Sequence, residues 1–269
     1  MTSSTPIVVW FRNDLRLADN PALRWACDQQ RPLILLYCYA PTEEGDWAPG
    51  GASRWWLHHA LIDLQTACSV KGSDLLLRQG PTLETLTQLI ADSGADTVVW
   101  NRRYEPAIIA RDTHIKQALT KAGVTARSFN GALLFEPDDV ATKQGKPYQV
   151  YTPFMRSCVA LPERPLAYAE PIKIPSPTVP LTSDALESWD LLPSKPWDLS
   201  FPQHWNPTRQ GGLDALNTFC DDALARYDDG RNLPSECGTS RLSPYLHHGQ
   251  LGPREVWHAL QDGSLDLTS

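Results

Sequence analysis

The stretch that decides the fold is Ile7-Val8-Val9-Trp10-Phe11-Arg12-Asn13-Asp14-Leu15-Arg16-Leu17-Ala18-Asp19-Asn20-Pro21-Ala22-Leu23. Its first five residues form an apolar run without alternation, which is typical of a strand covered on both faces of a parallel sheet. Asn20 before Pro21 predicts a helix that begins with proline and is capped by the asparagine side chain. The stretch therefore predicts a strand, a polar loop and a helix.

The same pattern recurs along the first half of the chain. Further apolar runs occupy residues 33–39, 75–77, 97–100 and 125–129. Between them, apolar residues recur at helical spacing, with Ser53 as the expected N-cap of the second helix and Gly123 as the expected stop of the last. Repeated strand–helix units with right-handed crossovers predict an α/β fold with a doubly wound, parallel, five-stranded sheet over residues 1–131.

The second half of the chain has a different character. Residues 132–207 read as a long proline-rich linker, because ten prolines between Leu161 and Pro207 mostly exclude regular helices and central strands there. Trp189, Trp197 and Trp205 lie in this linker and predict that it is pinned to a surface. Helical spacing returns in residues 208–269, which are too few for a large core and resemble the beginning of a domain.

Composition and charge restrict the functions open to this chain. At 42% hydrophobic residues it can bury a core, and the six cysteines form no Cys-x-x-Cys pair, which predicts reduced thiols and a cytoplasmic protein. No signal peptide and no apolar run long enough for a membrane span are visible. The net charge is −7 and falls entirely in residues 131–269, so the chain shows no excess of cations with which to grip DNA.

The polar loop after the first strand allows two interpretations. Arg12 and Arg16 are expected at the carboxyl end of the sheet, where ligands gather, and each guanidinium could hold a carboxylate or phosphate. Alternatively, both arginines form a lattice with Asp14 and Asp19 that fixes the loop. The glycine pattern of an ordinary dinucleotide-binding loop is absent.

A second cluster, Gly238-Thr239-Ser240-Arg241-Leu242-Ser243-Pro244, joins three hydroxyls and a guanidinium. If Ser243 caps a helix that begins at Pro244, the cluster suits a diphosphate, although Ser-Pro caps are common in general. The pairs His58-His59 and His247-His248 lack a third ligand at a fitting spacing, so we expect no metal site.

Together, the segments Val9–Asn20, Lys146–Phe154 and Gly238–Gly249 resemble three motifs of the DNA photolyase and cryptochrome family, in the same order along the chain. The match is to the N-terminal part of a class I bacterial deoxyribodipyrimidine photolyase. The resemblance implies an α/β antenna domain, a linker (residues 132–207) and the truncated beginning of an all-helical FAD-binding domain (residues 208–269).

The resemblance also implies site residues and a reaction. FAD would be held by Tyr227, Thr239, Ser240, Arg241, Leu242 and Ser243. Arg231 would face DNA. The family reaction is the light-driven repair of cyclobutane pyrimidine dimers, in which excited reduced FAD donates an electron to a flipped-out dimer. No catalytic residue maps onto this chain, because the electron-transfer residues of the family fall beyond its end.

Two departures from the family pattern qualify these expectations. The chain is barely half as long as family members, so we expect the isolated chain to be an inactive monomer that binds FAD weakly or not at all. Ala107 and Ile108 stand where folate-using members carry Asn-Glu, which puts a folate antenna in doubt and leaves a deazaflavin, a flavin or no antenna open. The alternative functions are a cryptochrome-type blue-light photoreceptor and a plain nucleotide-binding α/β domain.

Overall fold

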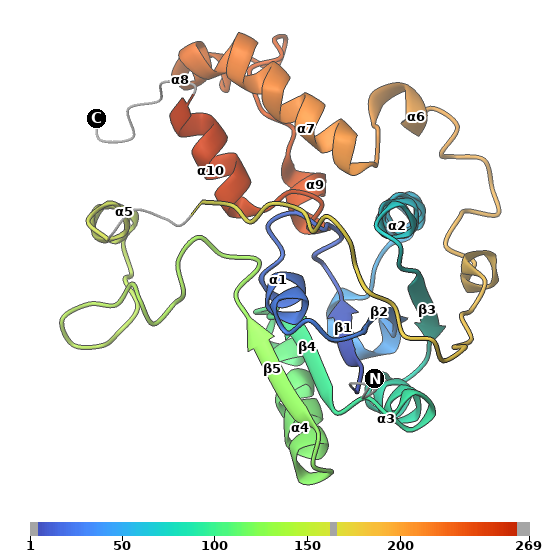
Figure 1. Ribbon diagram of the computed structural model, residues 1–269. Helices are drawn as coiled ribbons and strands as arrows, with labels where there is room; N and C mark the ends of the chain where they lie inside the picture. Colours follow the sequence, from blue (N-terminus) through green and yellow to red (C-terminus); the bar gives the residue numbers. More distant parts are fainter. Residues whose placement is uncertain (1–4, 162–165, 263–269) are drawn as a thin grey trace.

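The computed structural model describes residues 5–161 and 166–262 and contains one five-stranded parallel sheet (Figure 1). The strand order is β3-β2-β1-β4-β5. The strands are β1 (Ile7–Phe11), β2 (Leu33–Tyr39), β3 (Leu75–Gln79), β4 (Thr97–Asn101) and β5 (Thr125–Phe129). The chain runs outward from β1 to β3 and then crosses back to β4, which is the doubly wound topology that the apolar runs predict.

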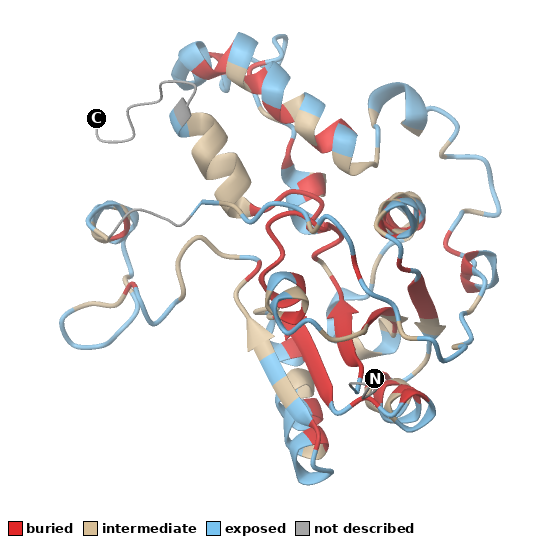
Figure 2. Ribbon diagram, viewed as in Figure 1, coloured by how far each residue is buried: buried red, intermediate tan, exposed pale blue. Residues whose placement is uncertain are grey.

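Helices cover both faces of the sheet, and alternate residues of β1 point into the two layers. Val9 belongs to the apolar cluster that α1 (Pro21–Asp28) and α2 (Gly51–Val70) complete. Trp10 belongs to the cluster on the opposite face, with α3 (Thr82–Ser93) and α4 (Pro106–Lys121). Figure 2 shows the buried strands at the centre of the α/β part, which explains why they carry no polar alternation.

The helix ends were predicted with mixed success. Asn20 is the N-cap of α1, and its side chain accepts a hydrogen bond from the Leu23 amide. Gly123 follows α4 with a φ of +80°, as expected of a glycine stop. The prediction for Ser53 is wrong: α2 begins at Gly51 with Gly50 as its cap, so Ser53 already lies inside the helix.

The proline-rich stretch lies along the α/β part, as its tryptophans predict. The Ile174 amide donates to the Lys71 carbonyl at 2.9 Å, and the Asp184 amide donates to the Leu77 carbonyl at 2.8 Å. Trp189, in the short helix η3 (Leu186–Trp189), stacks on Tyr39 with a ring separation of 5.2 Å. These contacts fix the proline-rich segment against the surface of the α/β part, although the segment has little regular secondary structure.

Two helices within the described part of residues 132–207 were not predicted, α5 (Tyr151–Val159) and the four-residue α6 (Phe201–His204). Helix α5 (Tyr151–Val159) lies apart from the sheet at the left of Figure 1. Its Pro153 falls in the first turn, where the missing amide would have no partner in any case. The sequence did not reveal it because only Cys158 of this helix is buried.

Two short helical turns, η1 (Pro41–Glu43) and η2 (Gly45–Trp47), follow β2. The remaining helices lie in the upper half of Figure 1, beyond the carboxyl end of β1. They are α6 (Phe201–His204), α7 (Arg209–Thr218), the π-helical turn η4 (Phe219–Ala223), η5 (Leu224–Arg226), α8 (Tyr227–Gly230), α9 (Ser243–His247) and α10 (Pro253–Asp262). Pro253 opens α10, as predicted. Ser243 is the first residue of α9 and makes no capping hydrogen bond, which corrects its predicted role as a cap.

Candidate functional site

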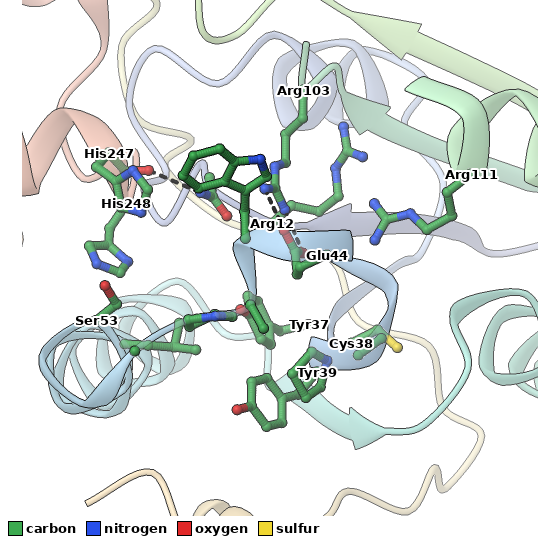
Figure 3. Close-up of a pocket in the computed structure, with 18 of the residues that line it drawn as sticks. Arg12, Tyr37, Cys38, Tyr39, Glu44, Ser53, Arg103, Arg111, His247 and His248 are labelled. Atoms are coloured by element: carbon green, nitrogen blue, oxygen red, sulfur yellow. Dashed lines mark hydrogen bonds and ion pairs between the residues drawn. The ribbon is translucent and has the colours of Figure 1, made fainter. Parts of the chain in front are cut away.

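A cavity of about 230 Å³ opens at the carboxyl ends of β1 and β2, where a doubly wound sheet is expected to bind ligands (Figure 3). In Figure 3, Arg103 and Arg111 lie on one side of it and His247 and His248 on the other. The wall residues that carry polar or aromatic groups include Trp10, Arg12, Asn13, Tyr37, Cys38, Tyr39, Glu44, Trp47, Ser53, Arg103, Arg111, His247 and His248. The cavity thus draws on both halves of the chain.

The arginines of the cavity are all paired with carboxylates. Arg12 contacts Asp112 and the Asn101 carbonyl, and Arg103 donates to both oxygens of Glu44 at 2.7 and 2.8 Å. Burial lowers the pKa of Arg12, although the neighbouring Asp112 carboxylate favours the charged guanidinium. Burial opposes the charge of Arg103 as well, but its hydrogen bonds to carboxylates outweigh burial and raise its pKa. The site therefore offers little free positive charge to a phosphate.

Aromatic rings supply much of the remaining wall. Trp10 is almost fully buried, and the guanidinium groups of Arg12 and Arg111 lie 4.7 and 5.3 Å from its ring centroid. The Trp10 indole Nε1 has no hydrogen-bond partner among the described residues. Burial raises the pKa of Tyr37 and Tyr39, which keeps both phenols neutral. Such a recess suits a planar, largely uncharged ring system.

The two residues that put a folate antenna in doubt lie outside this cavity wall. Ile108 is buried in the core, and the Cβ of Ala107 would lie only 3.3 Å from a Cβ placed on Gly45. Neither side chain can form a hydrogen bond with a ligand. The two residues that differ from the folate-using pattern therefore do not line the cavity themselves.

The loop after β1 is a buried polar lattice. Arg12, Asp14, Arg16 and Asp19 are each at most 5% exposed. Asp14 accepts hydrogen bonds from the Arg12 amide and from the Asn101 side chain. The Arg16 guanidinium donates hydrogen bonds to three carbonyl groups, those of Asp19, Gly249 and Gly131. Of the two interpretations of this loop, the lattice therefore holds for Arg16, whereas Arg12 both belongs to the lattice and lines the cavity.

The same loop fastens α9 to the sheet. The Leu15 amide donates to the His248 carbonyl at 3.2 Å, and the Asn13 side chain donates to the His247 carbonyl at 3.1 Å. Burial lowers the pKa of His248 to about 3, so this imidazole is neutral where it closes the cavity. The first and third sequence motifs thus form one structural unit.

The residues expected to hold FAD lie on an open surface of the helical part. Thr239, Arg241 and Ser243 are exposed, Ser240 is half-buried and Leu242 is buried. The hydroxyls of Thr239, Ser240 and Ser243 have no hydrogen-bond partner within residues 5–161 and 166–262. These groups are therefore free to donate to a ligand.

A close glycine contact brings the two parts of this expected site together. A Cβ on Gly238 would overlap the backbone of Gly230, so the segment that begins at Gly238 can pass directly beside the end of α8. Tyr227 is the first residue of that helix and Arg231 follows its last, and the Arg231 guanidinium lies 5.4 Å from the Tyr227 ring centroid. The structure thus places all of the sequence-predicted residues on neighbouring segments.

Several residues of the cavity were not predicted. Arg103 follows β4 and Tyr39 ends β2, so the rule that ligands gather at the carboxyl ends of strands could have found both. His247 had been weighed only as a metal ligand. In the described ranges no three His, Cys, Asp or Glu side chains come close enough to hold a metal ion. Likewise, no described helix is long and apolar enough to cross a membrane.

Comparisons with known proteins agree with the fold and the motifs. The family model described as DNA photolyase matches residues 7–175. The deoxyribodipyrimidine photo-lyase of Agrobacterium fabrum is 44% identical over 99% of this chain and 55% of its own length. Cryptochrome-1 of Arabidopsis thaliana is 34% identical over 94% of this chain and 37% of its own length.

A solved structure gives the same result. The crystal structure described as a bacterial class III photolyase from Agrobacterium tumefaciens superimposes with a TM-score of 0.91 at 43% identity, over 96% of this chain and 53% of that one. That protein is described as class III, whereas the motifs had suggested class I. The chain spans about half the length of the curated photolyases that it matches. On the family match and the shared fold, this chain belongs to the DNA photolyase family.

Proposed function

We propose that this chain is the N-terminal portion of a light-driven, FAD-dependent photolyase that repairs cyclobutane pyrimidine dimers. The observation that carries the proposal is the close approach of Gly230 and Gly238, which lets the two expected flavin-binding segments lie side by side. The loop after β1 supports this arrangement by fastening α9 to the sheet.

The donors present fit one wall of an FAD site. Unpartnered hydroxyls of Thr239, Ser240 and Ser243 and the guanidinium of Arg241 suit the diphosphate. Leu242 would support this segment from below, and Tyr227 would lie at the side of the flavin. When bound, FAD would supply the photochemical electron, while the residues of this chain bind and orient it.

Of the residues in this chain, only Arg231 is expected to contact DNA. Arg231 is exposed and would face DNA, but the net charge of −7 gives the chain no general attraction for phosphates. We therefore propose that the isolated chain is a monomer that does not repair DNA, and that binding of damaged DNA needs further residues. Its six cysteines, which form no Cys-x-x-Cys pair, favour the cytoplasm.

The cavity at the end of β1 and β2 is proposed to hold an antenna chromophore. Its rings and fully paired arginines favour a planar heteroaromatic group, and Ala107 and Ile108 argue against the folate-using arrangement. Absorption and fluorescence of the protein purified from its source organism test this proposal. A bound deazaflavin or flavin would support it, and a folate would contradict the interpretation of residues 107 and 108.

A cryptochrome-type photoreceptor is the second candidate, favoured by the similarity to the Arabidopsis cryptochrome. The deciding experiment is to sequence the source gene past the codon for Ser269 and to express the complete product. Blue-light-dependent loss of cyclobutane dimers with this product would establish the repair function. A yellow, photoreducible product without repair activity would favour the photoreceptor. A product that binds no flavin would favour the third alternative, a plain nucleotide-binding α/β domain.

A further inference from the structure

Arg241 is held in an unusual way for an exposed arginine. Its guanidinium carbon lies 4.2 Å from the ring centroid of Trp205, and one Nη donates to the His204 carbonyl at 3.4 Å. Arg241 also adopts a φ of +53°, a backbone region that residues other than glycine rarely occupy. Both the side chain and the backbone of this residue are thus constrained.

The charge of Arg241 is not neutralised. No carboxylate of the described segments pairs with it, in contrast to the arginines of the cavity, which all have carboxylate partners. An indole ring attracts a guanidinium without cancelling its charge, and it leaves the in-plane N–H groups open. The arrangement therefore presents a fixed, uncompensated cation on the residue that directly follows Thr239 and Ser240 in the expected diphosphate-binding segment.

Trp205 is in turn held by the α/β part of the chain. Its ring packs against Trp56 of α2 at a centroid separation of 5.7 Å. The Trp56 indole donates to Gln250 at 2.7 Å, and Gln250 donates to the Pro207 carbonyl at 2.8 Å. The position of Trp205 is thus fixed from α2 and from the turn after α9 at the same time.

The segment on either side of Trp205 is fastened as well. The Tyr245 hydroxyl donates to the Asn206 carbonyl at 2.9 Å, and a Cβ on Gly211 would overlap that same carbonyl oxygen. The backbone around Trp205 therefore has little freedom to move away from Arg241.

We propose that Trp205 is a positioning residue for Arg241, and that it aims this guanidinium at the diphosphate of FAD. The inference rests on the proposed flavin site. It assigns a binding role to one of the linker tryptophans, all of which the sequence had suggested are packing residues. The indole acts through Arg241 and does not itself contact the ligand.

The test measures the affinity of the complete gene product, freed of bound FAD, for FAD, ADP and riboflavin by isothermal titration calorimetry. Trp205→Leu is expected to weaken FAD and ADP about two- to fivefold, the worth of one exposed cation–π contact. Arg241→Gln is expected to weaken both about tenfold, because a charge-assisted bond to phosphate is lost. Riboflavin, which has no diphosphate, should be unaffected by either change.

A double-mutant cycle separates positioning from simple packing. If Trp205 acts through Arg241, Trp205→Leu has no further effect on affinity once Arg241 is glutamine. Trp197→Leu is the matched control, because this linker tryptophan packs on Phe201 and not on Arg241, and it should leave affinity unchanged. Should Trp205→Leu fold poorly, Trp205→Phe keeps a ring in place and is expected to lose less than twofold.

The outcomes distinguish this inference from the proposed function. If FAD binds and Arg241→Gln weakens it, but the effects of the two substitutions are additive or Trp205→Leu has no effect, the positioning role is refuted and the flavin site stands. If the complete product binds neither FAD nor ADP, or Arg241→Gln has no effect on its affinity, the flavin site itself fails and the positioning role fails with it.

Discussion

Arg16 donates from Nη1 to the carbonyl oxygen of Gly249 at 2.8 Å and so joins two loops that are 233 residues apart in sequence. The first loop follows β1 and the second follows α9. The loop at Gly249 approaches so closely that its backbone lies directly on that of Asn13. Two motifs that characterise the family at opposite ends of this chain therefore depend on each other for their geometry.

The first prediction concerns Arg16, which is 1% exposed. Arg16→Met would leave the carbonyl groups of Asp19, Gly131 and Gly249 without their donor in a buried place. We expect the free energy of unfolding to fall by about 3–5 kcal/mol, as when one partner of a buried charged network is removed. Urea unfolding followed by circular dichroism measures this loss.

Arg24→Ala is the control for that experiment. Arg24 makes an exposed ion pair with Asp28, both about half exposed, so its removal should cost less than about 0.5 kcal/mol. Equal losses for the two variants would show that the buried lattice contributes nothing beyond surface charge.

The second prediction concerns Gly249, which has a φ of +70°. Gly249→Ala adds the cost of a left-handed residue to a steric overlap with the Asn13 carbonyl, and we expect at least about 3 kcal/mol of destabilisation. Gly123→Ala is matched in backbone conformation, with a φ of +80°, but a Cβ there meets no atom within 4 Å. This control should cost only about 1–2 kcal/mol.

Thermal unfolding of both glycine variants gives the comparison directly. A Gly249 variant as stable as the Gly123 variant would mean that the two loops can separate without loss.

The sequence predicted the sheet well because β1 to β4 are buried on both faces, and such strands must be apolar throughout. It could not decide between a lattice and a ligand site for Arg12 and Arg16, because that choice depends on carbonyl groups more than 80 residues away. The sequence predicted Ser53 as the N-cap of α2, because a serine before an apolar helix face is the usual signal. The helix instead begins two residues earlier, at Gly51, with Gly50 as its N-cap.

The candidate site shows the same division. The segment 238–243 was proposed as a phosphate site because its glycine and hydroxyl residues suit a diphosphate and because it resembles the family motif, and it stays a prediction. The cavity was predicted only in part: Arg12 was expected at the carboxyl end of the sheet, and the same rule could have found Arg103 and Tyr39. His247 comes from a distant segment that only the tertiary fold brings there. No local pattern linked Trp205 to Arg241, because the two residues are 36 positions apart in the sequence.

A third prediction is that the chain alone neither retains nor repairs damaged DNA. With a net charge of −7 it lacks the cations that electrostatic binding requires, and Arg231, if it faces DNA as proposed, would supply a single phosphate contact. Fluorescence anisotropy with ultraviolet-irradiated duplex at physiological salt should show no saturable binding. Light-dependent loss of dimers catalysed by the purified chain with added FAD would contradict the prediction.

The fourth prediction concerns pH and His248. Burial lowers the pKa of His248 to about 3 in the folded chain, below the value of about 6.5 for an unfolded histidine. Between these values the unfolded chain binds a proton that the folded chain does not, so stability is greatest above about pH 6.5 and declines as the pH falls. For one histidine the decline approaches about 1.4 kcal/mol per pH unit.

His248→Phe tests this assignment, because phenylalanine can keep the stacking on Trp56 while it removes the titrating group. Urea unfolding at several pH values between about 4.5 and 6.5 should show a slope lower by about 1.4 kcal/mol per pH unit in the variant. A residual slope should persist, since burial also lowers the pKa of His58 and His59. The same slope in both proteins would mean that the imidazole at the cavity wall is solvated or protonated in the folded chain, and that α9 does not close the cavity as tightly as the hydrogen bonds to the loop after β1 imply.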